Sequence, residues 1–218
     1  MKPLIVLNLK TYKEAAGKNA LRLAKQLEKV RPKNYDLVVA PSLLMLKEIS
    51  EKTSLTVYSQ HADNVSLGAH TGMIPVEELK NIGIKGTLLN HSERKIPLQD
   101  LSEIIEACRK NKLKTIVCAS SLPETEKIAK MKPDFLAYEP PELIGGDVSV
   151  TKARPDVILK ALEIVEKSSP GTKVLCGAGV HSKQDLGQAL ILGAKGVLIG
   201  HAVSKARDPA KFLREMLA

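Results

Sequence analysis

Most of the residues with clear chemical potential in this 218-residue chain stand directly after short apolar runs. These positions carry a lysine, a glutamate, histidines, amides and glycine-bearing turns: Asn8, Lys10, Gln60, His61, Asn90, His91, Glu139, Gly177, Gly179, Gly200 and His201. A cation, an imidazole and a carboxylate together suit an anionic ligand and proton transfer. This set of residues contains no cluster of His and Asp that could bind a metal ion, so we expect no metal site. We expect no cofactor either.

The hydrophobic pattern predicts the elements that position these residues. Apolar runs rich in Val, Ile and Leu recur at Leu4–Leu9, Leu37–Ala40, Leu55–Ser59, Ile84–Leu89, Thr115–Cys118, Phe135–Tyr138, Val174–Cys176 and Val197–Ile199. Most of them lack strict alternation, which is typical of strands covered on both faces of a parallel sheet. The segments between them, such as Leu21–Val30 and Ile158–Val165, carry apolar residues at helical spacing. Ser182 and Asp208 stand where helix N-caps are expected.

Eight strand-like runs alternating with helical segments predict an α/β fold, a single (β/α)8 barrel over residues 1–218. The chain allows about 27 residues per unit, which is short but workable for this architecture. A doubly wound open sheet is the structural alternative. It is disfavoured because the first run ends in Asn8-Leu9-Lys10 rather than in a glycine-rich dinucleotide fingerprint. In a barrel, the residues that follow the strands meet at one face.

Composition narrows the class of protein further. No apolar run reaches the roughly 18 residues of a membrane span, and the N-terminus lacks a secretory signal pattern. The net charge is +9, but basic residues are mixed with Glu along helical segments and only six aromatic residues are present, which disfavours nucleic-acid binding. Three cysteines without metal-ligand spacing read as buried thiols of a reducing compartment. We therefore expect a cytoplasmic protein with no membrane association.

Three motifs resemble the signatures of the triosephosphate isomerase family. They are Asn8-Leu9-Lys10, Asn90-His91-Ser92-Glu93-Arg94 and Tyr138-Glu139-Pro140, in order along essentially the whole chain. The short length and the sequence Pro140–Gly146 are similar to the archaeal branch of the family. The resemblance implies interconversion of dihydroxyacetone phosphate and D-glyceraldehyde 3-phosphate through an enediolate, in glycolysis and gluconeogenesis.

The resemblance also implies a role for each catalytic residue. Glu139 would be the base that removes the C–H proton, and Lys10 would supply a fixed cation, held by Asn8, which would also orient a substrate oxygen. His91 would be a neutral electrophile. We expect Ser92–Lys95 and the segment from Leu98 to be helical, with one or more positive helix ends facing that ring and lowering its pKa. Glu93 matches a further acidic position of the family and ranks below Glu139.

The substrate phosphate would bind at the glycine-bearing turns that follow the last two strands. The expected contacts are Gly179, Gly200 and His201, joined by Ile144 and Gly145 from a lid over Pro140–Lys152. Two positions depart from the better-known family pattern. Gly179 replaces a common serine, and His201 replaces a small residue and would add a second charge-sensitive group.

The long turn His61–Met73 corresponds in the family to a loop that enters the neighbouring subunit, so we expect a homodimer or homotetramer. His70 and His181 are expected on the surface. Two alternatives remain open. One is another phosphate-binding barrel enzyme, such as a sugar-phosphate epimerase or an isomerase of aromatic amino-acid synthesis. The other is a catalytically silent sugar-phosphate sensor, which would keep the glycine turns but need not keep Lys10, His91 and Glu139 together.

Overall fold

The computed structural model describes residues 1–140 and 153–218 and contains a closed barrel of eight parallel strands in sequence order. The strands are β1 (Leu4–Asn8), β2 (Asp36–Ala40), β3 (Thr56–Ser59), β4 (Gly86–Leu89), β5 (Lys114–Ala119), β6 (Phe135–Tyr138), β7 (Lys173–Cys176) and β8 (Gly196–Ile199). Each lies within about one residue of an apolar run in the sequence, except that β4 begins two residues later. The predicted (β/α)8 barrel is therefore confirmed.

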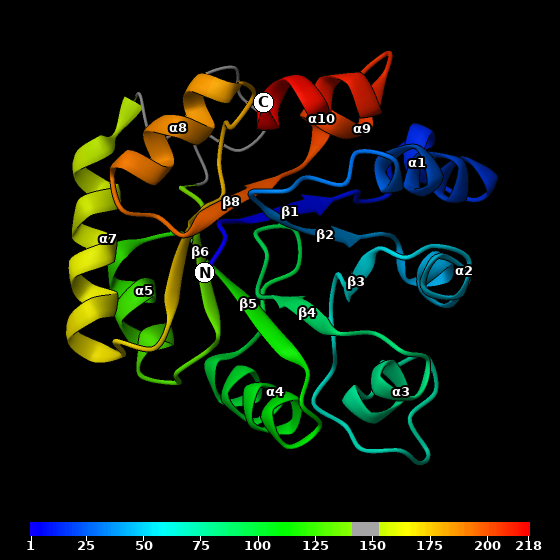
Figure 1. Cartoon of the computed structure of the whole chain (residues 1–218). Coiled ribbons are helices and arrows are strands. Elements are labelled where there is room, and N and C mark those ends of the chain that lie inside the picture. Colours follow the sequence, from blue (N-terminus) through cyan, green and yellow to red (C-terminus); the bar gives the residue numbers. More distant parts are fainter. Residues whose placement is uncertain (141–152) are drawn as a thin grey trace.

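Helices surround the barrel, as Figure 1 shows. They are α1 (Lys18–Glu28), α2 (Leu46–Lys52), α3 (Val76–Asn81), α4 (Leu98–Lys110), α5 (Leu122–Ala129), α7 (Pro155–Ser168), α8 (Lys183–Ile191), α9 (His201–Ser204) and α10 (Pro209–Leu217), with 3₁₀ turns η1 (Lys13–Ala15) and η2 (Leu43–Met45). The helix starts expected at Ser182 and Asp208 are confirmed, because the two side chains accept hydrogen bonds from the N–H groups of Asp185 and Lys211.

The pleat of the strands divides the core into two layers. Ile5 and Leu7 of β1 belong to the larger cluster, which includes the buried faces of the helices, whereas Leu4 and Val6 belong to a smaller cluster formed by strand residues. Successive side chains of a strand point to opposite faces, so the smaller cluster fills the barrel interior. Burial on both faces explains why the runs lack strict alternation.

Closure of the barrel depends on a glycine at the start of β8. Gly196 pairs with Leu4 of β1, and a Cβ on Gly196 would collide with the Leu4 carbonyl oxygen. Its φ of +149° also lies in a region that favours glycine. With the ring closed, the residues that follow all eight strands gather at one face.

Across the two described segments, no helix has both the length and the apolar character needed to cross a membrane.

Candidate active site

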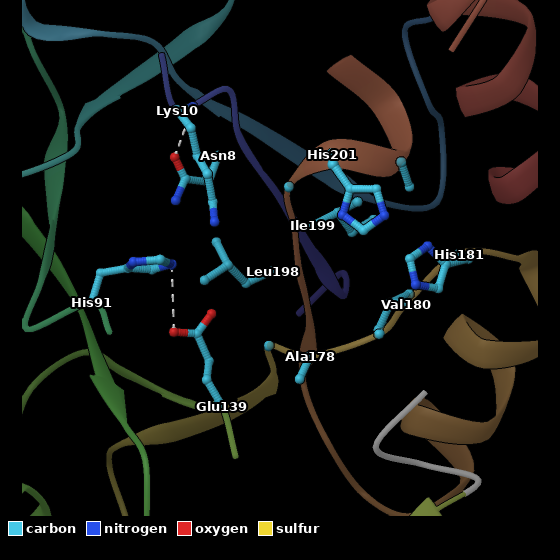
Figure 2. Close-up of a pocket in the computed structure, with 14 residues that line it drawn as sticks. Asn8, Lys10, His91, Glu139, Ala178, Val180, His181, Leu198, Ile199 and His201 are labelled. Carbon is cyan, nitrogen blue, oxygen red and sulfur yellow. Dashed lines mark hydrogen bonds and ion pairs between the residues drawn. The ribbon is translucent and has the colours of Figure 1, made fainter. Parts of the chain in front are cut away.

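A pocket opens at the carboxyl ends of the strands and collects most of the site residues expected from the sequence. Figure 2 shows Asn8 and Lys10 on one side, His91 and Glu139 below them, and the segments after β7 and β8 opposite. The walls are Asn8, Lys10, His91, Glu139, Gly177, Ala178, Gly179, Val180, His181, Leu198, Ile199, Gly200, His201 and Ala202. The barrel therefore brings together residues 131 positions apart in the chain, from Asn8 to Glu139.

Glu139 is a buried carboxyl group at the floor of this pocket. It follows β6, its backbone N–H donates to the Ala119 carbonyl at 2.8 Å, and only 3% of the residue is exposed. Its Oε2 atom accepts no hydrogen bond from any residue of the described segments. Burial raises the pKa of Glu139 to about 7, against smaller lowering effects from the Cys118 thiol and Lys10. A carboxyl group in this state can take up and release a proton near neutral pH.

Gly177 makes room for that carboxyl group. A Cβ built on Gly177 would overlap the Glu139 side chain and stand 2.9 Å from its Oε1. The sequence suggested that the glycines after β7 serve a phosphate, but this one is required by Glu139. The sequence shows a Gly-x-Gly turn at this position, but only the fold shows that Gly177 faces Glu139.

His91 lies beside Glu139, with its Nε2 3.8 Å from the Glu139 Oε2. The Glu93 backbone N–H donates to the Nδ1 atom of His91 at 3.2 Å. Nδ1 is therefore an acceptor, and in the neutral ring the proton belongs on Nε2, which faces the pocket. Burial, assisted by the positive charge of Lys10, lowers the pKa of His91 to about 4. The ring is neutral at pH 7.

The helix expected from Leu98 is confirmed, but the one expected at Ser92–Lys95 is wrong. These residues form a turn in which the Arg94 N–H donates to the His91 carbonyl, and the next helix, α4, begins at Leu98. The low pKa of His91 therefore arises from desolvation and Lys10, not from a helix end starting at Ser92.

Lys10 is held at the pocket rim by contacts with its backbone and its side chain. Its φ of +48° is unusual for a residue with a side chain, and its N–H donates to the Asn8 Oδ1 at 3.1 Å. Gln60 donates from Nε2 to the carbonyls of Lys10 and Ala40, at 3.2 and 2.9 Å. The Lys10 Nζ pairs with the Glu93 Oε1 at 2.9 Å. The supporting contacts of Gln60 were missed from the sequence, which showed it only as a strand-end residue.

A second network missed from the sequence anchors the segment that carries His91. Asn90 has a φ of +57°, and its Nδ2 donates to the Glu124 Oε1 at 2.8 Å. Burial of Glu124 opposes ionisation, but hydrogen bonds from Ser120, Lys95 and Asn90 outweigh it and lower the pKa of Glu124 to about 2. Glu124 is thus a carboxylate that ties the β4–α4 segment to the start of α5.

The segments after β7 and β8 form the side of the pocket opposite His91. Gly179 has a φ of +65°, and a Cβ built on Gly200 would lie 3.5 Å from the Lys10 Cε. His201 follows Gly200, and His181, which was expected on the surface, is instead half-buried in the pocket wall. The expectation for His70 is confirmed, since it is exposed. Apart from Pro140, the lid expected over Pro140–Lys152, with Ile144 and Gly145, lies outside the described residues.

The start of the long turn at His61–Met73 is pinned next to the site. Asp63 lies between the buried His61, whose Nε2 is 2.9 Å from the Asp63 Oδ1, and Arg94, at 3.3 Å. The Ile74 N–H donates to the other oxygen of the same carboxylate. Farther along, Leu67 and Met73 are 55% and 43% exposed.

No group of three or more His, Cys, Asp or Glu side chains suited to a metal ion occurs within 1–140 and 153–218. The pocket thus offers a cation, a neutral imidazole and a basic carboxyl group around a small ligand.

Comparisons with known proteins give a consistent result. A family model described as triosephosphate isomerase matches residues 3–216. The chain is 42% identical to the triosephosphate isomerase of Methanothermus fervidus, over 99% of this chain and 98% of that protein. It is 42% identical to the one from Methanocaldococcus jannaschii, over 98% of both chains, and 40% identical to the one from Archaeoglobus fulgidus, over 98% and 96%.

Proposed function

The chain belongs to the triosephosphate isomerase family, and on that premise we propose which of its residues carry the reaction. It is an isomerase that interconverts dihydroxyacetone phosphate and D-glyceraldehyde 3-phosphate, a step of glycolysis. In the opposite direction, the same reaction serves gluconeogenesis. The observation that carries the assignment of roles is the Glu139–His91 pair, 3.8 Å apart beside Lys10 in one buried pocket.

Glu139 is the base. Its carboxylate removes a proton from the carbon next to the substrate carbonyl and, once protonated, returns that proton to the neighbouring carbon. Because burial raises its pKa to about 7, Glu139 is a much stronger base than an exposed carboxylate yet is substantially ionised at neutral pH.

His91 and Lys10 stabilise the oxyanion that forms when the proton leaves. The Nε2–H of His91 donates to the substrate oxygen, and a neutral imidazole is matched in acidity to an enediol. The Lys10 Nζ places a positive charge near the same oxygens and near the phosphate. Asn8 and Gln60 hold the Lys10 backbone in its unusual conformation, which fixes where that charge lies.

The phosphate binds at the opposite wall. Backbone N–H groups at Gly179, Gly200 and His201 are its proposed donors, because these residues line the pocket and glycine allows a close approach. By resemblance, Ile144 and Gly145 of the lid complete the contacts, and lid closure excludes water that would promote phosphate loss from the enediolate.

A coupled assay with the purified protein tests both the activity and the roles. We expect turnover of both triose phosphates. A crystal structure with a phosphate-bearing inhibitor should place the phosphate against Gly179 and Gly200 and the reacting carbons between Glu139 and His91. Binding without turnover would instead support a sugar-phosphate sensor.

We propose that the protein is cytoplasmic and assembles as a homodimer or homotetramer. Three buried, unpaired cysteines within the described segments are consistent with a reducing compartment. The exposed Leu67 and Met73 on the 61–73 turn give that turn the apolar side chains an interface needs. In the assembly, the turn of one subunit would support Lys10 of the next.

A further inference from the structure

Two histidines face each other at the end of the pocket away from Glu139. His181 follows β7 and His201 follows β8, and their ring centroids are 5.0 Å apart with the planes tilted by 54° (Figure 2). Both rings belong to the wall that also contains Gly179 and Gly200. An imidazole pair therefore lies beside the backbone groups assigned to the phosphate.

The surroundings of the pair are rich in charge. His181 and His201 also line an adjoining cavity of about 910 Å³, whose charged residues are Lys205, Arg207, Asp208, Lys211 and Glu215. Several of these have partners of their own. Lys205 lies over the Tyr12 ring, the Asp208 carboxylate accepts from the Lys211 N–H, and the Lys211 Nζ is 3.9 Å from Glu215.

Two further charged groups flank the pair within the barrel. Lys10 contributes a positive charge to the same pocket. Behind His181, the Asp185 carboxylate of α8 accepts hydrogen bonds from the backbone N–H of His181 at 3.1 Å and from the Ser182 hydroxyl at 2.8 Å. Cations that line the two cavities and the buried Asp185 carboxylate behind the wall thus surround the two imidazoles.

We propose that His181 and His201 form a protonatable clamp on the substrate phosphate, which takes up one proton from solvent when the phosphate dianion binds. This inference rests on the proposed function, because it extends the phosphate site of that reaction. An imidazole has an ordinary pKa near 6.5, and a dianion placed next to it favours the protonated form. Binding then joins a dianion to an imidazolium N–H donor, and no covalent bond is made or broken.

The clamp makes substrate affinity depend on pH independently of the chemical step. As the pH falls from 8.0 to 6.5, the proton that the clamp takes up becomes more available from solvent. Over the same range a phosphate monoester, with a second pKa near 6, remains largely dianionic. Because a pKa raised by one unit corresponds to a tenfold change in affinity, KM should fall about three- to tenfold over this range. Protonation of Glu139 lowers kcat over the same range, so KM and kcat respond to different groups.

Kinetics of His181→Asn, His201→Asn and the double variant test the clamp. We expect the double variant to raise KM at pH 6.5 about three- to tenfold and to flatten its pH dependence. Lys183→Gln is the matched control, because it removes an exposed positive charge two residues from His181 that does not line the pocket. A double variant with the parent's KM at both pH values would overturn the proposal.

A titration of the unmodified protein with inorganic phosphate tests it without any substitution. In NMR spectra at constant pH, the ring resonances of His181 and His201 should shift on phosphate binding, while those of the exposed His70 should not. This result would support the clamp even if the protein showed no isomerase activity, so the two proposals can fail separately. Unmoved His181 and His201 resonances at phosphate concentrations that inhibit turnover would overturn it.

Discussion

Glu139 and His91 show how one physical cause can prepare two groups for opposite tasks. Burial disfavours the charged form of each, so it raises the pKa of the carboxyl group to about 7 and lowers that of the imidazole to about 4. At pH 7 the first can exchange protons and the second is a neutral donor. Desolvation in one pocket thus favours the uncharged form of both groups, and the chemical nature of each group decides whether its pKa rises or falls.

Replacing Glu139 by Gln should lower kcat by about 10²–10⁴, the usual contribution of a positioned base. Steady-state kinetics in the coupled assay measure the loss. Glu126→Gln, an exposed position on α5, is the matched control and should retain full activity. If the Glu139 variant turned over at a rate near that of the parent, Glu139 could not be the base.

The stability of the same variant separates the loss of the base from a loss of folding. The folded-state pKa of about 7 lies above the ordinary value of 4.5, so folded Glu139 binds its proton more tightly than the unfolded chain does. The stability associated with that proton is present below pH 4.5 and is lost as pH rises through 7. Glu139→Gln should therefore raise Tm at pH 8 relative to the parent, with a smaller difference at pH 5.

His91 should titrate far below the ordinary value for histidine. Burial and Lys10 hold its pKa at about 4, so the ring stays neutral as pH falls from 8 to 5. NMR of the labelled ring should find one tautomer throughout, with the proton on Nε2, because Nδ1 accepts from the Glu93 N–H. A midpoint near 6.5 would contradict the assignment of His91 as a neutral electrophile.

At the scale of elements, the site depends on how the segments that follow the strands are fixed. The turn after β4 is tied to α5 by Asn90 and Glu124, and Lys10 after β1 is held by Gln60 after β3. After β7, Gly177 leaves the volume that Glu139 occupies. Small errors in such positions matter, because a displacement of about 1 Å can lower a rate about 10²-fold.

Gly177→Ala, a substitution after β7, should therefore lower catalysis by displacing Glu139 after β6. The new methyl group overlaps the Glu139 side chain, so the carboxyl group must move, and we expect kcat to fall about 10- to 100-fold. Gly187→Ala in α8, where a Cβ meets no atom within 4 Å, is the control and should keep activity and stability. Kinetics and thermal melts of both variants decide the matter; unchanged kcat in Gly177→Ala would contradict the packing argument.

At the scale of the whole molecule, the proposed assembly would give the site of one chain support from a neighbouring subunit. The 61–73 turn is pinned at its base by His61, Asp63 and Arg94 but carries exposed apolar residues farther along. An exposed apolar projection of this kind is typical of an interface.

Replacing Met73 by Glu should shift the protein from oligomer to monomer and lower kcat, because a charge would be buried in the interface and support for Lys10 would be lost. Light scattering coupled to size-exclusion chromatography measures the mass. Leu159→Glu, at an exposed apolar position on α7, tests whether any new surface charge has the same effect. A parent protein that is monomeric at micromolar concentration would overturn the assembly proposal.

Local sequence was sufficient for the architecture and for most of the chemical groups. Apolar runs, helical spacing and the caps at Ser182 and Asp208 depend on neighbours in the chain, so they predicted the eight strands and several helices. The motifs around Lys10, His91 and Glu139 predicted which side chains would meet, because a barrel brings the ends of its strands to one face.

Only the tertiary structure decided how those groups are tuned. Several features of the site depend on contacts between segments, most of them far apart in the chain. They are the tautomer of His91, the space that Gly177 leaves for Glu139, the hydrogen bond from Asn90 to Glu124 and the contact of His181 with His201. Desolvation likewise depends on everything packed around a group. These properties arise from long-range packing, so they could not be predicted from a local pattern of residues.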